Sequence, residues 1–237
     1  MMLGGPRVTI LSASPAAPNP TFVKTLGTGI YATGTTTSGL LVIKIPALGL
    51  KNWALFFGAI AGGLSGSRTA AVTFKGGTPW LHKSYGGVGR VVAGRCPDTL
   101  YPTGTTVDLS LTPGTKLILA AVMEYTGTVG VNRFTVDSLT TNVTHFTGGV
   151  PTGQPNCTIV AATKLLALKA TTPTPPVVSA TLDGVSMTQR AYINTTSPLT
   201  SQDWETLVVF DGAAPLATTH HAVIFSIPGA ISAAVLI

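Results

Sequence analysis

Residues 110–122 read SLTPGTKLILAAV, and residues 225–237, FSIPGAISAAVLI, follow the same plan. In each stretch an apolar run reaches a Pro-Gly dipeptide, and a second run rich in Ala, Val, Leu and Ile begins soon after it. Short apolar runs bounded by turn residues are typical of β-strands. The repeated plan predicts an all-β chain in which one arrangement of strands occurs twice.

Two other dipeptides predict β-hairpins. Gly76-Gly77 lies between two alternating segments in residues 71–83 (AVTFKGGTPWLHK), and Asp183-Gly184 has the same place in residues 179–190 (SATLDGVSMTQR). Both dipeptides tolerate the positive φ angles that a tight primed turn requires. A hairpin, a Pro-Gly turn and an Ala-rich strand therefore occur once in each half of the chain. This order favours a pseudo-duplicated sandwich, and the alternative is the simple reuse of common turns.

Further apolar runs, each bounded by Gly, Pro, Asn or Asp, recur at the spacing expected of a β-sandwich. The only competing pattern lies at Thr163–Ala170, which could instead form two turns of helix. Strands are expected near residues 39–45, 53–60, 70–75, 78–83, 88–93, 105–111, 116–125, 132–137, 157–162, 164–169, 177–182, 185–190, 205–210, 220–226 and 230–237.

The predicted fold class is all-β: an antiparallel, jelly-roll-like β-sandwich, pseudo-duplicated, with an extended N-terminal arm. The arm comprises residues 1–20, in which four prolines forbid a helix. Residues 21–127 are the first sandwich half or domain, and residues 128–237 are the second. An extended arm needs a surface to lie on, either its own body or a neighbouring copy. The contact residues expected in the arm are Arg7, Val8, Ile10 and Leu11.

The composition is poor in charge. Only 9% of the residues are charged and 45% are hydrophobic, while threonine alone accounts for 38 residues. Soluble domains usually carry roughly a quarter of charged residues. Intrinsic disorder is excluded by the many Val, Ile, Leu and Phe residues, and no run of about 18 apolar residues predicts membrane insertion. No signal peptide pattern is visible at the N-terminus. Such a surface indicates contact with other molecules.

Two stretches, residues 70–92 and 103–128, resemble the β-sandwich domains of bacteriophage minor tail proteins and related virion structural proteins. The resemblance covers about residues 37–127 and lies in the pattern of strands and turns. It implies a non-enzymatic structural component of a phage virion, assembled in the host cytoplasm in many copies, with other copies and other virion proteins as partners. The matching residues are Val72, Thr73, Gly76, Gly77, Gly104, Thr105, Val107, Ala120, Ala121, Tyr125 and Gly127.

Two alternative functions remain open. The first is a capsid decoration or head-spike protein, because an extended arm is equally suited to gripping a capsid lattice. The second is a carbohydrate-binding sandwich that attaches to a host-surface glycan. In that case Trp80, Tyr85 and Trp204 are the candidate stacking platforms, since sugars pack on exposed aromatic rings.

No catalytic, metal or cofactor site is predicted from the motifs. Asp203 and Glu205 would share one face of a strand, as a glycosidase pair would, but a polar strand entry is the favoured interpretation. His220 and His221 would face opposite sides of a strand and so could not bind one metal ion together. The two cysteines, Cys96 and Cys157, are expected to be free thiols that behave as small hydrophobic residues.

Charge is distributed unevenly along the chain. Residues 1–133 carry 11 basic and 3 acidic residues, whereas residues 134–237 carry 3 basic and 5 acidic ones. Basic residues beside Trp80 and Tyr85 suit a nucleic-acid platform, but the absence of an arginine-rich run disfavours nucleic acid. We expect instead that the basic half of one copy meets the acidic half of another. The candidate contacts, besides the arm, are Lys75, Lys83, Arg90, Arg95, Val235, Leu236 and Ile237.

Overall fold

The protein is described by a computed structural model, and every element of secondary structure among its described residues is a β-strand. The predicted all-β, antiparallel class is therefore confirmed for the described part of the chain. No helix long and apolar enough to cross a bilayer occurs there. The described residues are 20–32, 40–44, 46, 48–49, 52–61, 70–74, 81–85, 89–96, 106–111, 117–127, 135–137, 145–152, 155–170, 174–197, 201–227 and 230–236.

The strands of the first half form two sheets. Sheet I has the order β2-β7-β4, and sheet II has the order β1-β8-β3-β6-β5. All of their pairs are antiparallel. The strands are β1 (Thr21–Ala32), β2 (Leu40–Lys44), β3 (Trp53–Ala61), β4 (Ala70–Phe74), β5 (Leu81–Tyr85), β6 (Gly89–Cys96), β7 (Thr106–Leu111) and β8 (Leu117–Thr126).

The strands of the second half form two more sheets. Sheet III has the order β14-β15-β11-β17-β9, and sheet IV has the order β10-β16-β12-β13. These pairs are antiparallel as well. The strands are β9 (Thr135–Asp137), β10 (His145–Pro151), β11 (Cys157–Leu168), β12 (Val177–Leu182), β13 (Val185–Ser186), β14 (Thr188–Thr196), β15 (Asp203–Ala214), β16 (Thr219–Ile227) and β17 (Ala230–Leu236).

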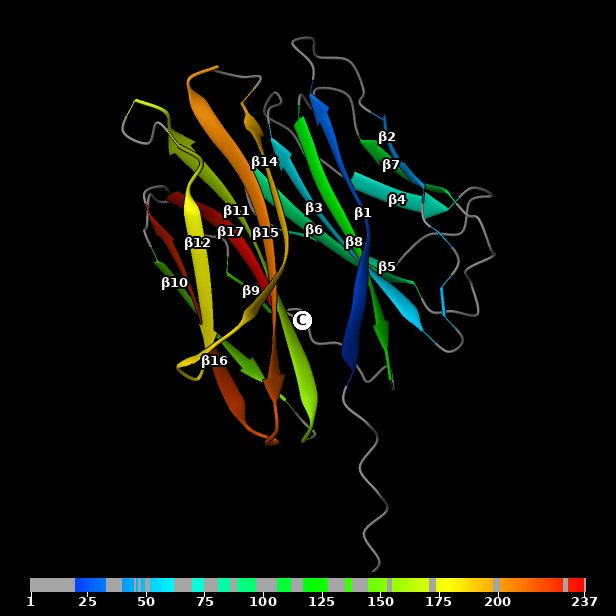
Figure 1. Ribbon diagram of the computed structural model, residues 1–237, viewed down its shortest axis with the longest axis vertical. Coiled ribbons are helices and arrows are strands. Elements are labelled where there is room, and N and C mark those ends of the chain that lie inside the picture. The colour runs from blue at the N-terminus through cyan, green and yellow to red at the C-terminus, as the bar shows by residue number, and fades with distance from the viewer. Residues whose placement is uncertain are drawn as a thin grey trace, which may run out of the picture.

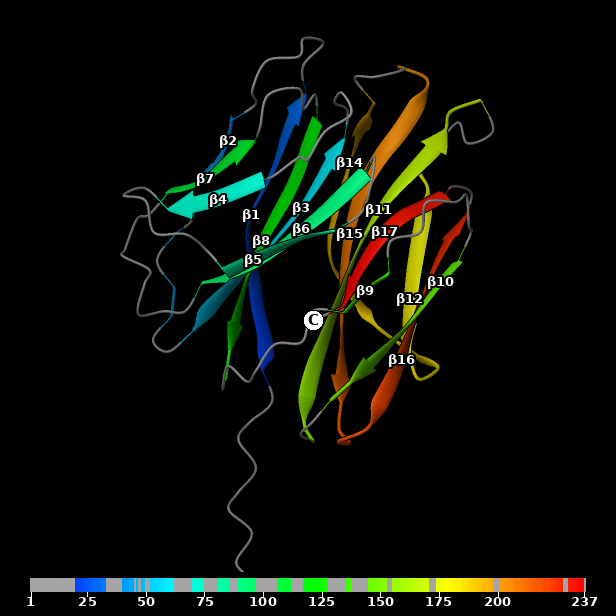
Figure 2. The same cartoon turned by 180° about the vertical axis from the view of Figure 1, so that it is seen from behind.

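The four sheets are stacked face to face, with sheets II and III in the middle and sheets I and IV outside (Figures 1 and 2). The central strands of the middle sheets are thus covered on both faces, which explains why β3 and β8 read as continuous apolar runs rather than as an alternation. In β8, every side chain from Leu117 to Tyr125 is buried. The continuous apolar runs that begin at Trp53 and Leu117 therefore belong to strands that are buried on both faces.

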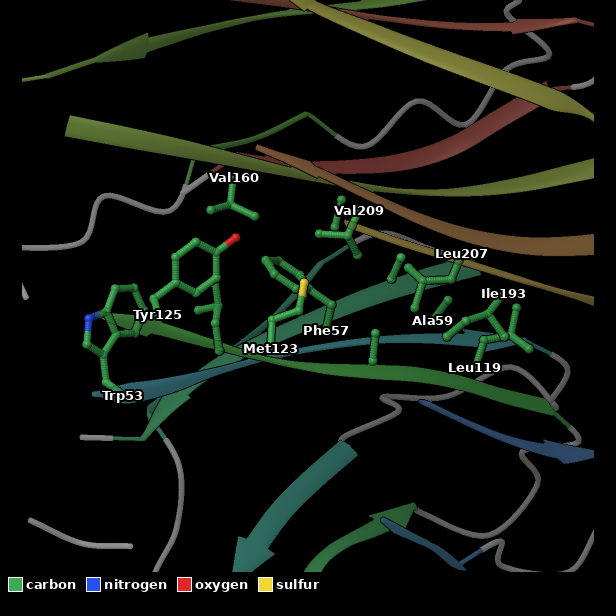
Figure 3. Packing of buried hydrophobic residues seen from close by; sticks show 14 of the residues in the cluster. Trp53, Phe57, Ala59, Leu119, Met123, Tyr125, Val160, Ile193, Leu207 and Val209 are labelled. Carbon is green, nitrogen blue, oxygen red and sulfur yellow. The ribbon is translucent and has the colours of Figure 1, made fainter. Parts of the chain in front are cut away.

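Side chains of sheets II and III share one core (Figure 3). Burial of apolar surface contributes about 25 cal/mol per Å², so this layer joins the two halves of the chain into one packed body. Sheet II contributes Trp53, Leu55, Phe57, Ala59, Leu117, Leu119, Ala121, Met123 and Tyr125, and sheet III contributes Val160, Ala162, Ala191, Ile193, Leu207 and Val209.

A second core lies between sheets III and IV. Alternate residues of β11 and β15 point into it, because successive side chains of a strand face opposite sides of its sheet. Its members are Ile159, Ala161, Leu165, Val208, Phe210 and Ala214 from sheet III, with Val178, Ala180, Leu182, Met187, Ala222 and Ile224 from sheet IV and its connection to β14.

Two glycines of β1 allow sheet I to approach sheet II closely. A Cβ atom at Gly27 would lie 2.8 Å from Cγ2 of Ile43, and one at Gly29 would lie 3.0 Å from Cδ1 of Leu41. Both distances are well inside the optimal carbon–carbon separation of about 3.5–4.0 Å. Glycine at these positions therefore lets β2 pack across β1.

The structure corrects several strand predictions. The segment that could have been helical, Thr163–Ala170, is extended as far as Leu168, and the two strands expected at 157–162 and 164–169 are one strand, β11. Two strands were not expected from the sequence at all, namely β1 and β10. β1 was missed because its apolar residues are interrupted by threonine, lysine and glycine.

One of the two predicted hairpins is confirmed and the other is wrong. At Asp183-Gly184, residues Leu182 and Val185 pair across a two-residue turn, and the φ angles of 50° and 83° are those of a primed turn. On either side of Gly76-Gly77, by contrast, β4 pairs with β7 in sheet I, whereas β5 pairs with β6 in sheet II. A glycine pair permits a tight turn, but the sheets that cover the core decide where each strand pairs.

Candidate functional site

Among the described residues, a cluster of aromatic and charged side chains joins the two halves at one edge of sheets II and III. We name it the edge cluster, and it consists of Phe22, Trp53, Tyr125, Arg190 and Asp211. The Tyr125 ring stacks on Trp53 with centroids 5.1 Å apart and meets Phe22 edge-on at 5.7 Å. Each residue comes from a different strand, so the cluster exists only because β1, β3, β8, β14 and β15 converge.

A partly buried charge pair completes the edge cluster. Nε of Arg190 lies 2.8 Å from Oδ1 of Asp211, and the guanidinium of Arg190 sits 4.2 Å from the Phe22 ring centroid. The Tyr125 hydroxyl donates to Oδ2 of Asp211 over 3.3 Å. Burial, and next the negative charge of Asp211, raise the pKa of Tyr125 far above its ordinary value. The hydroxyl therefore stays protonated and acts as a permanent donor between the halves.

Two further hydrogen bonds tie β1 and the residue before it to the second half. The Thr25 hydroxyl donates to the Arg190 carbonyl oxygen at 3.0 Å, and the Thr158 hydroxyl donates to the Pro20 carbonyl oxygen. Sequence reasoning missed this site because its members lie up to 189 positions apart and carry no local motif. The only available signal was the Ala/Val strand ending in Tyr125.

The two carboxylates considered as a glycosidase pair belong to the interior. Asp203 and Glu205 lie in β15 and are 5% and 1% exposed. Nζ of Lys164 lies 2.9 Å from Oε2 of Glu205, and the Ser197 hydroxyl donates to Oε1 of Glu205 at 3.2 Å. Glycoside hydrolysis needs carboxylates that flank a bound sugar. Glu205 instead neutralises the buried Lys164.

The acid excess predicted for the second half lies mostly inside the protein. Asp203, Glu205 and Asp211 are all buried. Asp183 is 45% exposed, but it accepts hydrogen bonds from the backbone N–H of His221 and from the ring of His220. Little acidic surface on the described residues is thus left to attract the basic half of a neighbouring copy.

Of the three aromatic residues expected to stack on a ligand, only Trp204 is described with its side chain. Trp204 is half-buried at the start of β15, and Nζ of Lys169 lies 4.4 Å from its ring centroid. The same ammonium donates to the Thr196 hydroxyl at 2.6 Å. Tyr85 is placed by its backbone at the end of β5, in sheet II rather than sheet III, and Trp80 lies outside the described residues.

The predicted contact residues are placed only in part. Lys83 lies in β5, and Arg90 and Arg95 lie in β6. Val235 and Leu236 lie in β17, whose backbone pairs with β11 on one side and β9 on the other. At Val235 and Leu236 a second copy could therefore make contact only through side chains. Arg7, Val8, Ile10, Leu11, Lys75 and Ile237 lie outside the described residues.

The adjacent histidines face opposite sides of β16, as predicted. His220 is 2% exposed, and its two ring nitrogens lie 2.5 Å from Oδ2 of Asp183 and 2.9 Å from the Leu216 carbonyl oxygen. Two acceptors favour the doubly protonated ring. The described part of the chain holds no group of three residues suited to a metal ion. Cys157 is a half-buried thiol outside any disulfide, and Cys96 is placed by its backbone in β6.

Comparison with protein-family models, with curated proteins and with solved structures finds no match to this chain.

Proposed function

We propose that the chain is a non-enzymatic structural component of a bacteriophage virion, of the minor tail type, built from two jelly-roll-like sandwiches in tandem and used in many copies. The observation that carries the proposal is the order of strands in the four sheets. Double-sheet jelly rolls are a recurrent architecture of viral capsid proteins and lectins. The step from architecture to role is by analogy, supported by the resemblance of residues 70–128 to virion proteins.

The strand orders of the two halves correspond one to one. Sheet II reads β1-β8-β3-β6-β5, and sheet III, taken from its other edge, reads β9-β17-β11-β15-β14. Sheet I reads β2-β7-β4, and sheet IV reads β10-β16-β12 with the short β13 added. Strands with the same rank along the two halves of the chain, with β13 left out, thus occupy the same positions in corresponding sheets. This supports a duplication of one eight-stranded unit, with β13 as an addition to the second.

The repeated sequence plan falls on the matched strands. Both Pro-Gly dipeptides lie between strands of different sheets, Pro113-Gly114 between β7 and β8, and Pro228-Gly229 between β16 and β17. Gly76-Gly77 and Asp183-Gly184 likewise both follow matched strands, β4 and β12. In each eight-stranded unit, the first, eighth, third and sixth strands are adjacent in one sheet. This order supports a jelly-roll-like unit, because the last strand of a jelly roll also lies between the first and the third.

Assembly of the purified protein tests the virion role. We expect light scattering after size exclusion and electron microscopy to show particles of many copies, and antibodies against the chain to label phage tails. Labelling of heads would favour the capsid decoration or head-spike alternative. A chain that stays monomeric at high concentration at every salt concentration, and labels no particle, would contradict the proposal.

The arm provides a matched variant for the same test. Deletion of residues 1–19 should abolish assembly and leave the circular dichroism spectrum of the sandwich unchanged. The proposed interface role of the arm would be wrong if the deleted protein assembled as well as the full chain.

One observation favours a second candidate function, the binding of a host-surface glycan. Trp204 lies beside the polar side chains of Lys169 and Thr196, and an aromatic ring with adjacent hydrogen-bonding groups suits a sugar. Binding to a glycan array that is lost in Trp204→Ala and retained in Trp204→Phe would support this candidate. Equal binding by both variants, or none by the unmodified protein, would exclude Trp204 as the platform.

A further inference from the structure

The inner faces of sheets II and III meet in a particular order. β1 lies against β14, β8 against β14 and β15, β3 against β15 and β11, and β6 against β11 and β17. If each strand of the second half is given the number of its counterpart in the first, sheet II in the order 1-8-3-6-5 faces sheet III in the order 5-6-3-8-1. The order on one side is the reverse of the order on the other, and the two third strands, β3 and β11, meet in the middle.

The directions of the strands show which rotation relates the two halves. β3 and β11 run in the same direction, as the arrowheads at one end of the molecule show (Figure 1). The core agrees, because Trp53 at the start of β3 lies at the same end as Val160 near the start of β11, whereas Ala59 lies at the end with Leu207 (Figure 3). Reversed order across the interface with unchanged direction along the strands is the result of a rotation by half a turn about an axis parallel to the strands.

We propose that the chain is a fused dimer: two equivalent sandwiches related by a pseudo-two-fold axis that runs between β3 and β11, with sheets II and III as an internal isologous interface. The proposal rests on the duplication proposed above. In an isologous interface each contact occurs twice, with the partners exchanged. The contact of β8 with β15 indeed has its counterpart in the contact of β17 with β6, and that of β3 with β15 in that of β11 with β6. The partner that fits the inner face of either half is thus another sandwich of the same kind.

The edge cluster distinguishes this molecule from a symmetric dimer. It lies where β1 meets β14, and its residues Phe22, Arg190 and Asp211 have no symmetry requirement to be repeated at the opposite edge. A single chain can place a cation and its acceptor on one side only, because the two copies of the unit have separate sequences. The edge cluster therefore favours pairing of the first half with the second half over pairing of two identical halves. The apolar core between sheets II and III would stabilise either kind of pair.

Two-fold symmetry makes a sharp statement about connections. The distance from the end of β8 to the start of β9 must equal the distance from the end of β17 to the start of β1. The chain spans the first distance with the eight residues 127–134. Eight residues must therefore also suffice to connect Leu236 to Thr21.

The test reverses the order of the halves. One variant starts at Val131, runs to Ile237 and continues through a six-residue Gly/Ser linker into Pro20, ending at Gly130, so that eight residues separate β17 from β1. A second variant retains the whole chain by joining Ile237 to Met1, which gives a longer connection. The matched control keeps the native order of residues 20–237 and carries eight Gly/Ser residues in place of 127–134.

We expect both reversed variants to show the near-ultraviolet circular dichroism and the urea midpoint of the control. A folded control together with an unfolded short variant overturns the two-fold axis, whether or not the long variant folds. This readout is independent of the virion role. Reversed variants that fold while the native chain fails to assemble would contradict the proposed function alone.

Discussion

Tyr125 shows how a single side chain connects the two halves. It is fully buried, stacks on Trp53 and meets Phe22 edge-on within its own sheet, and reaches Asp211 of the other half with its hydroxyl. Asp211 is engaged by Arg190 at the same time. Because Tyr125 and Asp211 are buried, loss of the hydrogen bond between them leaves a polar atom that water cannot reach.

Replacement of Tyr125 by Phe should therefore destabilise the whole molecule. The ring contacts stay, and the lost hydrogen bond to a charged acceptor costs about 1–2 kcal/mol of unfolding free energy. Urea unfolding measures the change. Tyr192→Phe is the matched control, since its hydroxyl also donates to one oxygen, that of Pro176, but the side chain is 36% exposed and water can take its place. Equal losses in the two variants would contradict the role given to Tyr125.

His220 and Asp183 make stability depend on pH. Burial lowers the pKa of His220, but the acceptors at Leu216 and Asp183 outweigh it, so its pKa is raised above the ordinary value of 6.5. The backbone N–H of His221 and next the ring of His220 lower the pKa of Asp183 below 3.8. The stabilisation from His220 is complete below pH 6.5 and is lost as the pH rises through its raised pKa. That from Asp183 is complete above pH 3.8 and is lost as the pH falls through its lowered pKa.

The pair thus stabilises the protein most between about pH 4 and pH 6.5, the ordinary pKa values of the two groups. We expect His220→Gln to lower the urea midpoint more at pH 5.5 than at pH 9. His221→Gln is the control, because its ring lies on the exposed face. An equal effect of His220→Gln at the two pH values would show that the ring acts through packing alone.

At the scale of elements, the hairpin between β12 and β13 is specified by its own residues. Gly184 has a φ of 83° with open space around it, so an added Cβ would meet strain but no clash. Gly184→Ala should cost roughly 1–2 kcal/mol of unfolding free energy, the usual penalty of a left-handed residue with a side chain. Gly149→Ala, in β10, is the control: its Cβ would make ordinary contacts at 3.5 Å, and no loss is expected there. Thermal unfolding at fixed pH compares the two variants.

Elements that are determined by residues close together in the sequence were predictable. Elements that depend on contacts between distant residues were not. Asp183-Gly184 sets its own turn, and the apolar runs at Trp53 and Leu117 can only be buried strands. The turn at Gly76-Gly77 was misjudged because the pairing of β4 and β5 depends on sheets whose other members are far away in the sequence. β1 escaped notice for a related reason: its glycines serve contacts with Ile43 and Leu41 that no local pattern reveals.

At the scale of the whole molecule, the stacking of sheets accounts for much of the 9% charge. Two middle sheets with apolar residues on both faces lower the charged fraction of any chain, whatever lies outside it. The buried acids show the same effect, since a sequence does not reveal which charges are interior. The candidate site was likewise invisible, because the edge cluster gathers residues from Phe22 to Asp211 that only the packing of the halves brings together.

A shared core between the halves implies that they unfold together. We expect one calorimetric transition, with a ratio of van't Hoff to calorimetric enthalpy near 1. Leu207→Asp, which places a charge in the core between sheets II and III, should lower the midpoint of that single transition. Two separate transitions in the unmodified protein would mean that the layer between sheets II and III contributes little.

The positions of β8 and β17 have a consequence for synthesis on the ribosome. Each is the last strand of its half to be made, yet each lies inside its sheet, between β1 and β3 or between β9 and β11. While a nascent chain waits for the closing strand, the two flanking strands have unpaired backbone edges. Neighbouring nascent chains on one messenger expose the same edges at the same time. The rate of elongation sets the time for which these edges stay unpaired. During that time the cell must keep them from pairing with other nascent chains.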